Sequence, residues 1–337
     1  MRKKPPKLVT VRDVAKVAGV SPITVSRALQ NSTLVREATR IKVRKAAEEL
    51  AYIPNFAAGT LSSNVSHMVG VIVPNMSNSI FAETLQSIAN ALRPSGYNLL
   101  IGHSDYSLEQ EEMLLRTFLS RRADAIVLTG CSHSDGTRAM LKAAGVPTVE
   151  MWSLPDEPIG VCVGISNHQA AFTMTNHLLA KGHRKIGFIG GELEDNDRTQ
   201  GRLQGYRDAL SSAGIDFSED MVRHVAFEFQ NGSAAMAGLL DGPQKLDAVF
   251  AASDILATGA LLECLRRGLR VPQDIAVGGL DDAGIAGVMT PALTTIAVPR
   301  QEIGQKVADV ISDMLSGIEP KQTVFDMGFT LIERETT

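Results

Sequence analysis

Ten short apolar runs, separated by helical stretches, constrain the fold of this chain more than any other sequence feature. Five lie at residues 68–74, 97–104, 124–130, 147–152 and 161–166, and five more lie at residues 185–191, 222–227, 246–253, 274–280 and 293–298. Near-continuous apolar strands that alternate with amphipathic helices are typical of parallel sheets covered on both faces. The two series therefore predict two similar Rossmann-like α/β subdomains within residues 68–337.

The charge of the chain is divided between a basic head and an acidic body. Residues 1–67 contain 12 Lys or Arg and 4 Asp or Glu, whereas residues 68–337 contain 21 and 33, so the balances are +8 and −12. A basic segment of this kind is typical of a module that binds a polyanion, because each cation placed on a phosphate releases a condensed counterion. The head is therefore expected to bind nucleic acid.

Two short helices joined by a tight turn are predicted within this basic head. Thr10 and Asp13 form a capping-box pattern that begins a helix ending near Ala18, and Gly19 suits the left-handed conformation of a helix C-cap. Ser21 is a good N-cap, and Pro22 then occupies the first helical position, where its missing N–H is not needed. Proline therefore begins the second helix and does not interrupt one.

This arrangement is a helix-turn-helix, whose second helix places its N-terminal residues at base edges in the DNA major groove. Pro22, Ile23 and Thr24 would lie at that end, where apolar contacts to thymine methyl groups are expected. Arg27, one turn further along, can reach O6 and N7 of guanine. We expect DNA contacts from Thr10, Ser21, Pro22, Ile23, Thr24, Ser26, Arg27, Asn31, Asn55 and Leu61.

A third basic, amphipathic helix is predicted at about residues 37–50, with Ile41, Val43, Ala47 and Leu50 on its apolar face. Arg36 precedes it at the N-cap position, although arginine caps poorly. A phosphate contact and a weaker helix start are both open as interpretations of Arg36.

The segments TVRDVAKVAGVSPITVSRAL (10–29), TRIKV (39–43) and ELAYIPNFAAGTLSS (49–63) resemble the DNA-binding head of the lactose-repressor family (LacI/GalR). The resemblance implies a headpiece at residues 1–54, a hinge helix and linker at 55–67 and a two-lobed effector-binding and dimerisation domain at 68–337. Two hinge helices would pair in the minor groove of a palindromic operator. Leu61 stands at the position of the family's intercalating leucine, an apolar wedge that unstacks a base step.

The resemblance extends through GHRKIGFIGG (182–191), RLQGYRDAL (202–210) and residues 250–282 and 292–311. It implies the fold of periplasmic sugar-binding proteins, with three crossovers between the lobes. Ligands of open α/β sheets bind beyond the carboxyl ends of the strands. Combined with the family's pattern, in which Arg202 clasps the effector and Ser253 and Asp281 hold hydroxyl groups, this rule selects Phe81, His133, Trp152, Arg198, Arg202, Ser253 and Asp281.

Within the family, the chain is most similar to the gluconate-operon repressors, through VPTVEMW, LTGCSH, VGISNHQAA, DRT and MGFTL. Arg198 and Arg202 suit a carboxylate, which guanidinium groups bind in a bidentate fork. We therefore expect a homodimeric repressor of sugar-acid catabolism that gluconate or a related aldonate, free or phosphorylated, releases from operator DNA. An activator or a co-repressor-dependent regulator that responds to a neutral sugar or sugar phosphate is the alternative.

Other classes of protein fit the sequence less well. It contains no G-x-G-x-x-G, P-loop, G-x-S-x-G or H-E-x-x-H pattern, so neither an enzyme nor a cofactor is expected. The three cysteines form no C-x-x-C pair, which argues against a disulfide framework or a zinc site. A periplasmic receptor would share the body but would require an export signal, and we see neither that signal nor a membrane span, which favours a cytoplasmic protein.

Overall fold

The computed structural model describes residues 9–29, 34–52, 65–76 and 78–337. They form two compact units, Met1–Ser66 and His67–Thr337, which are considered separately below. Among the described residues, no helix has both the length and the apolar content that crossing a bilayer requires.

The first unit is a three-helix headpiece made of α1 (Val11–Ala18), α2 (Pro22–Leu29) and α3 (Glu37–Glu49). The Asp13 carboxylate accepts hydrogen bonds from the Thr10 backbone N–H at 2.8 Å and the Thr10 hydroxyl at 2.7 Å, which fixes the start of α1. Gly19 ends α1 with φ +61°, a conformation that glycine adopts without steric cost. The small core contains Val14, Ala15, Ala18, Val25, Ala28, Val43, Ala46 and Ala47.

One prediction for α3 is wrong. Ile41 is 58% exposed, whereas Val43, Ala46 and Ala47 are buried. Residues 43, 46, 47 and 50 form the i, i+3, i+4, i+7 stripe of one helix face, and Ile41 lies about 200° around the axis from Val43. Arg36 is the N-cap, as expected, and makes no side-chain capping hydrogen bond.

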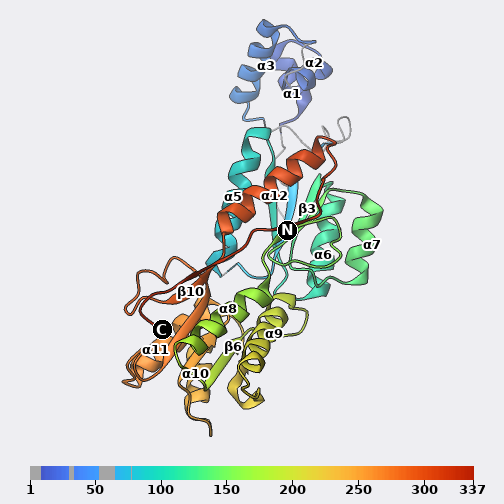
Figure 1. Ribbon diagram of the computed structural model, residues 1–337. Coiled ribbons are helices and arrows are strands. Elements are labelled where there is room, and N and C mark those ends of the chain that lie inside the picture. Colours follow the sequence, from blue (N-terminus) through green and yellow to red (C-terminus); the bar gives the residue numbers. More distant parts are fainter. Residues whose placement is uncertain (1–8, 30–33, 53–64, 77) are drawn as a thin grey trace, which may run out of the picture. The chain divides into compact units, whose positions relative to one another are not determined.

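The first sheet of the larger unit has the strand order β11-β5-β4-β3-β1-β2, with all strands parallel. Met68 pairs with Asn98, and Val69 pairs with Ala125. Helices α5 and α12 pack together on one face and α6 and α7 on the other (Figure 1). The elements are β1 (Met68–Val73), α5 (Ser79–Leu92), η1 (Arg93–Ser95), β2 (Asn98–His103), α6 (Leu108–Ser120), β3 (Ala125–Thr129), α7 (Asp135–Ala144), β4 (Thr148–Met151), β5 (Val161–Gly164), α12 (Arg300–Leu315) and β11 (Val324–Asp326). We call them the first subdomain.

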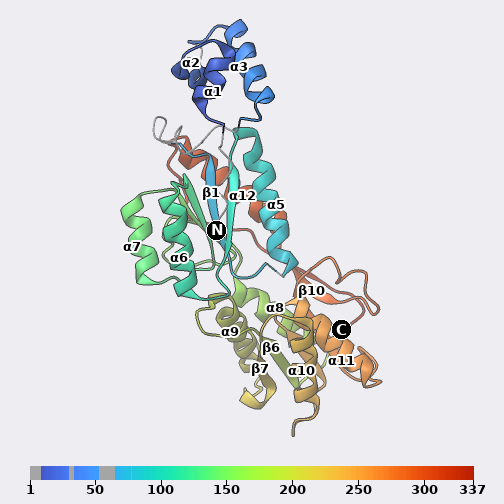
Figure 2. The same cartoon turned by 180° about the vertical axis from the view of Figure 1, so that it is seen from behind.

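The second sheet has the order β12-β10-β9-β8-β6-β7, and only β12 among its described strands runs antiparallel. Its helices pack as the pairs α8 with α9 and α10 with α11, as the reverse view also shows (Figure 2). The elements are α8 (Asn167–Ala180), β6 (Ile186–Gly190), α9 (Asp197–Ser212), η2 (Glu219–Met221), β7 (Val222–His224), α10 (Phe229–Leu240), β8 (Ala248–Ala251), α11 (Asp254–Arg266), β9 (Ala276–Asp281), β10 (Thr294–Ala297) and β12 (Thr330–Ile332). They form the second subdomain.

All ten predicted strands are present, and the chain passes between the sheets three times, as the family resemblance implies. The passages follow β5, β10 and β11. Strand residues alternate between the helix layers: Val71 and Val73 face a core shared with α5 and α12, whereas Ile72 faces the core under α6 and α7. The shared core continues onto the α8 and α9 face of the second sheet, so the two subdomains form one unit.

Candidate functional site

The start of α2 is the part of the headpiece for which the sequence predicts base contacts. Pro22 is the first helical residue, and the Ser21 hydroxyl oxygen accepts a hydrogen bond from the Thr24 backbone N–H at 3.2 Å. This geometry confirms that proline begins the second helix. The fixed φ of Pro22 and the Ser21 cap give this end of α2 a defined conformation.

The outward face of α2 presents the side chains that the sequence selected for base contacts. Ile23 is 65% exposed, and Pro22, Ser26 and Arg27 are also exposed, whereas Val25 and Ala28 are buried against the other helices. The three helices and the N-cap of α3 also carry exposed cations: Arg12, Lys16, Arg27, Arg36, Lys42, Arg44 and Lys45. The headpiece therefore carries its positive charge where DNA can reach it.

Three further candidates for DNA contact, Asn31, Asn55 and Leu61, lie outside the described residues, and so does the expected hinge helix. Thr10 is described, and its hydroxyl is engaged with Asp13 at the start of α1. The role of each in DNA binding stays a prediction.

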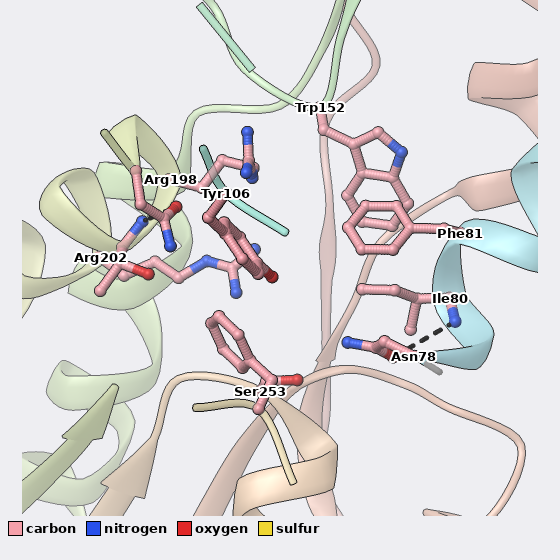
Figure 3. A pocket seen from close by; sticks show the side chains of 11 residues that line it. Asn78, Ile80, Phe81, Tyr106, Trp152, Arg198, Arg202 and Ser253 are labelled. Atoms are coloured by element: carbon pink, nitrogen blue, oxygen red, sulfur yellow. Dashed lines mark hydrogen bonds between the residues drawn. The ribbon is translucent and has the colours of Figure 1, made fainter. Parts of the chain in front are cut away.

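A pocket of about 310 Å³, partly open to solvent, lies between the two subdomains of the larger unit. Arg198, Arg202 and Tyr106 lie on one side, and Phe81, Trp152, Ile80 and Asn78 lie on the other (Figure 3). The lining residues are Asn78, Ile80, Phe81, Tyr106, Trp152, Asn196, Arg198, Thr199, Arg202, Phe227 and Ser253.

The cationic side of the pocket is built by the first two turns of α9. The Arg202 Nε donates to Oδ1 of Asn167 at 2.8 Å, and its Nη1 donates to the carbonyl oxygen of Ala252 at 2.6 Å. These bonds fix the guanidinium plane while using two of its five N–H groups. Burial lowers the pKa of Arg202, and Asp281 opposes this shift; arginine remains charged because its ordinary pKa is so high.

Arg198 is accompanied by Asp197, whose Oδ1 lies 3.3 Å from its Nη1. Asp197 also accepts hydrogen bonds from the Ser153 hydroxyl and from the Cys131 thiol at 3.2 Å, both in the first subdomain. Burial opposes ionisation of Asp197, but Arg198 and these donors outweigh it and hold the pKa of the carboxyl below its usual value. Asp197 therefore joins the two subdomains as a carboxylate beside the pocket.

The opposite side of the pocket is aromatic. Phe81 and Trp152 meet edge to face with ring centroids 5.4 Å apart, and Trp152 is 1% exposed. On the side of the arginines, Tyr106 stacks on Phe227 with ring centroids 5.8 Å apart, and burial raises the pKa of Tyr106 to about 12. Tyr106 is therefore a neutral hydroxyl at physiological pH, so it is available as a hydrogen-bond donor to a polar ligand.

Ser253 closes the pocket on the side of the second sheet, and its hydroxyl donates to Oδ2 of Asp281 at 2.7 Å. Asp281 is fully buried behind Ser253, and burial raises its pKa despite the opposing charge of Arg202. Burial and the neighbouring Asp281 raise the pKa of Asp254 to about 7. The carboxyl groups behind the pocket thus offset the positive charge of the arginines only in part.

His133 does not line this pocket, in contrast to the expectation from its position after β3. Its side chain is completely buried, with Nδ1 2.8 Å from Oε1 of Glu111 and Nε2 3.4 Å from Oε1 of Glu150. Burial alone would lower the pKa of His133, but the hydrogen bonds with these carboxylates raise it to about 9. The ring is therefore a charged structural element, and we assign it no effector contact.

The structure brings Phe81, Trp152, Arg198, Arg202 and Ser253 together around the pocket, with Asp281 directly behind Ser253. The strand-end rule did not select Tyr106, Asn196, Thr199 or Phe227. Tyr106 stands three residues beyond β2 in a turn, and Phe227 lies between β7 and α10. The only signal that could have found Tyr106 was its proximity to the polar stretch that follows β2.

A two-lobed ligand-binding domain joined to a helix-turn-helix headpiece defines a class of ligand-responsive DNA-binding regulators. The profile of bacterial regulatory proteins, lacI family, matches residues 10–55, and that of the periplasmic binding protein-like domain matches residues 175–337. The chain belongs to the lacI family of transcriptional regulators, which are not enzymes.

Individual relatives extend the match over nearly the whole chain. The HTH-type transcriptional regulator GntR of Pseudomonas aeruginosa is 41% identical and covers 97% of this chain and 95% of its own length. The crystal structure of a LacI family transcriptional regulator from Silicibacter pomeroyi is 33% identical, with a TM-score of 0.91 over 97% of this chain and 99% of that one. The crystal structure of the lac repressor dimer bound to operator and the anti-inducer ONPF has 26% sequence identity to this chain. Its TM-score is 0.83, and the match covers 98% of this chain and 99% of that chain.

Proposed function

We propose that this regulator is a homodimeric repressor of genes for sugar-acid catabolism, and that gluconate or a related aldonate releases it from a palindromic operator. The observation that carries the choice of effector is the pair Arg198 and Arg202 in one pocket, opposite an aromatic side. Guanidinium groups bind carboxylates through paired hydrogen bonds, whereas a neutral sugar brings no negative charge to pair with two buried arginines.

The charges around the pocket favour a singly charged effector. Asp197 is ionised and neutralises Arg198, whereas the buried Asp281, with its raised pKa, opposes Arg202 less effectively. The arginines therefore keep part of their positive charge for a ligand. A free aldonate, with one carboxylate, matches this balance better than a phosphorylated aldonate, which carries two further negative charges near neutral pH.

The remaining lining residues suit a polyhydroxylated chain. Asn78, Asn196 and Ser253 offer amide and hydroxyl groups, and Tyr106 offers a neutral phenol. Gluconate would place its carboxylate at the arginines and its hydroxyl groups among these side chains. Effector binding would then favour a subdomain arrangement with low operator affinity, through a coupling of about 1 to 3 kcal/mol.

A titration of the single tryptophan tests this proposal directly. Trp152 is the only tryptophan in the chain and lies in the pocket wall, so its fluorescence reports on this site alone. Gluconate is expected to change the emission saturably and to raise the melting temperature, because a ligand at about 100 times its Kd adds about 2.7 kcal/mol of stability. 6-Phosphogluconate and glucose are the comparison ligands.

The variant Arg202→Lys is expected to weaken gluconate binding at least tenfold, because lysine cannot form a bidentate fork. Arg207→Lys is the matched control, since Arg207 lies on the same helix in an exposed pair with Glu219. Equal gluconate affinity in the two variants, or no response of the wild-type protein to any sugar acid, would overturn the proposed effector.

The aromatic side supports a second candidate, a regulator that responds to a neutral sugar or a sugar phosphate, as activator or with a co-repressor. Phe81 and Trp152 provide apolar surface on which the C–H face of a sugar ring can pack. Glucose binding tighter than gluconate in the same titration would favour this alternative. Operator affinity measured with and without the ligand distinguishes release from recruitment.

A further inference from the structure

Asn167 stands at the first passage of the chain between the subdomains, and nothing in the sequence pattern selected it as a site residue. It is the first residue of α8, with only 7% of its surface exposed. Ser166 caps the helix by accepting a hydrogen bond from the Gln169 backbone N–H at 3.2 Å, so the Asn167 side chain is not needed as a cap.

The amide of Asn167 connects the pocket arginine to the opposite subdomain. Its Oδ1 accepts from Nε of Arg202 at 2.8 Å, and its Nδ2 donates to the carbonyl oxygen of Trp152 at 2.9 Å. Arg202 belongs to α9 of the second subdomain, and Trp152 follows β4 of the first. One end of the amide must accept and the other must donate, which fixes its orientation.

The surrounding backbone holds this amide closely. A Cβ atom at Gly201 would lie 3.4 Å from Cβ of Asn167, and one at Gly205 would overlap the carbonyl oxygen of His168. These two glycines let α9 approach the start of α8. On the other side, Trp152 has φ +76°, and its N–H donates to the carbonyl oxygen of Val163 at 3.1 Å.

We propose that Asn167 is a positioning residue that holds the Arg202 guanidinium for the effector and links it to the Trp152 backbone, so that occupation of Arg202 is transmitted to the first subdomain. This inference rests on the proposed response to a sugar acid. The first subdomain begins at β1, directly after the segment that connects to the headpiece. A change in the conformation of the first subdomain would therefore alter DNA binding.

Two substitutions separate the two hydrogen bonds. Asn167→Asp keeps an acceptor for Arg202 but replaces the donor with an oxygen that repels the Trp152 carbonyl, and Asn167→Ala removes both bonds. Asn231→Asp is the matched control, because Asn231 lies near the start of α10 and its amide also donates to a backbone carbonyl, that of Ala226. The measurements are the gluconate Kd from Trp152 fluorescence and operator affinity with and without saturating gluconate, on an operator selected from random duplexes.

For Asn167→Asp we expect weaker gluconate binding, because the new carboxylate offsets part of the charge of Arg202. At saturating gluconate we expect a loss of about fivefold in the factor by which gluconate lowers operator affinity, as one hydrogen bond between subdomains would give. Asn167→Ala should lose both gluconate affinity and the effect of gluconate on operator affinity. Asn231→Asp should keep both at the wild-type level. A wild-type response of operator affinity in Asn167→Asp, measured at saturating gluconate, would overturn the inference.

The ligand-free protein gives an independent test. Loss of the hydrogen bond to its carbonyl should shift the emission of Trp152 in Asn167→Asp but not in Asn231→Asp, and an unchanged spectrum would overturn the link between the subdomains. If gluconate fails to bind the wild-type protein, the proposed function is overturned, while the ligand-free spectra still decide the present inference.

Discussion

We expect the exposed residues of α2 to determine how the headpiece distinguishes one DNA sequence from another. Pro22 and Ile23 offer apolar contacts, and Arg27 is the polar side chain on the same outward face that can form two hydrogen bonds to guanine. We predict that Arg27→Ala reduces discrimination between the selected operator and random DNA by about 1 to 3 kcal/mol. Competition binding at fixed salt concentration measures this difference.

Arg36→Ala provides the comparison for Arg27. Arg36 is exposed at the N-cap of α3, and a contact with phosphate there would weaken operator and random DNA binding equally. If Arg27→Ala left discrimination at the wild-type level, α2 would not be the helix that reads base edges.

The buried His133 makes the stability of the body dependent on pH. Its pKa of about 9 in the folded protein lies above the value of about 6.5 in an unfolded chain. The resulting stabilisation is fully present below about pH 6.5 and is lost as the pH rises through 9, with an upper magnitude of about 3 kcal/mol. We predict that the free energy of unfolding in urea falls between pH 7 and pH 9.5.

His133→Gln removes the titrating group and should flatten this part of the pH profile, although the variant is less stable at pH 7. Titration of the ring by NMR gives the same information in the folded protein. A midpoint near 6.5, or an unchanged pH profile in His133→Gln, would show that the carboxylates of Glu111 and Glu150 do not hold the proton.

His133 and Tyr106 illustrate what the sequence could and could not predict about the pocket. The strand-end rule selected Phe81, Trp152, Arg198, Arg202 and Ser253, which all line the pocket, because parallel strands end at one edge of each sheet. It also selected His133, whose ring turns toward Glu111 and Glu150 instead. A side chain's direction depends on partners far away in sequence, and position after a strand does not reveal them.

At the scale of helices, the close packing of α8 on α9 depends on glycine. A methyl group at Gly205 would overlap the carbonyl oxygen of His168, so the helices would have to separate. We predict that Gly205→Ala lowers the free energy of unfolding by about 1 to 3 kcal/mol, the usual cost of overpacking. Urea denaturation measures the change.

Gly238→Ala is the matched control within a helix. Gly238 is exposed on α10, and its added methyl group would come no closer than 3.7 Å to Arg223. Alanine there should stabilise the protein by about 0.5 to 1 kcal/mol, because glycine is the poorer helix former. Destabilisation by both substitutions alike would contradict the packing argument.

The sequence predicted ten of the twelve described strands and missed β11 and β12. These strands have three residues each, Val324–Asp326 and Thr330–Ile332, and are only partly buried. Their strand pairing depends on β5 and β10, which are distant in sequence. Long buried strands can be predicted from their apolar composition. Short edge strands form because a neighbouring sheet edge is available, and the local sequence does not reveal this.

At the scale of the whole chain, DNA binding belongs to the basic headpiece and ligand binding belongs to the acidic body. The body joins its subdomains through Asp197 with Ser153 and Cys131, and through Asn167 with Trp152, all beside the pocket. Arg198 pairs with Asp197, and Arg202 pairs with Asn167. A ligand at the two arginines would therefore act on the immediate partners of residues that join the subdomains. This arrangement is the physical basis for the proposed control of DNA binding by an effector.

Operator affinity of the full chain, measured by fluorescence anisotropy with and without saturating gluconate, tests the central claim most directly. The account predicts that gluconate weakens operator binding of the wild-type protein by about 5- to 150-fold, and that Arg202→Lys responds only at much higher gluconate concentrations. Operator affinity that stays the same or increases at saturating gluconate would contradict it.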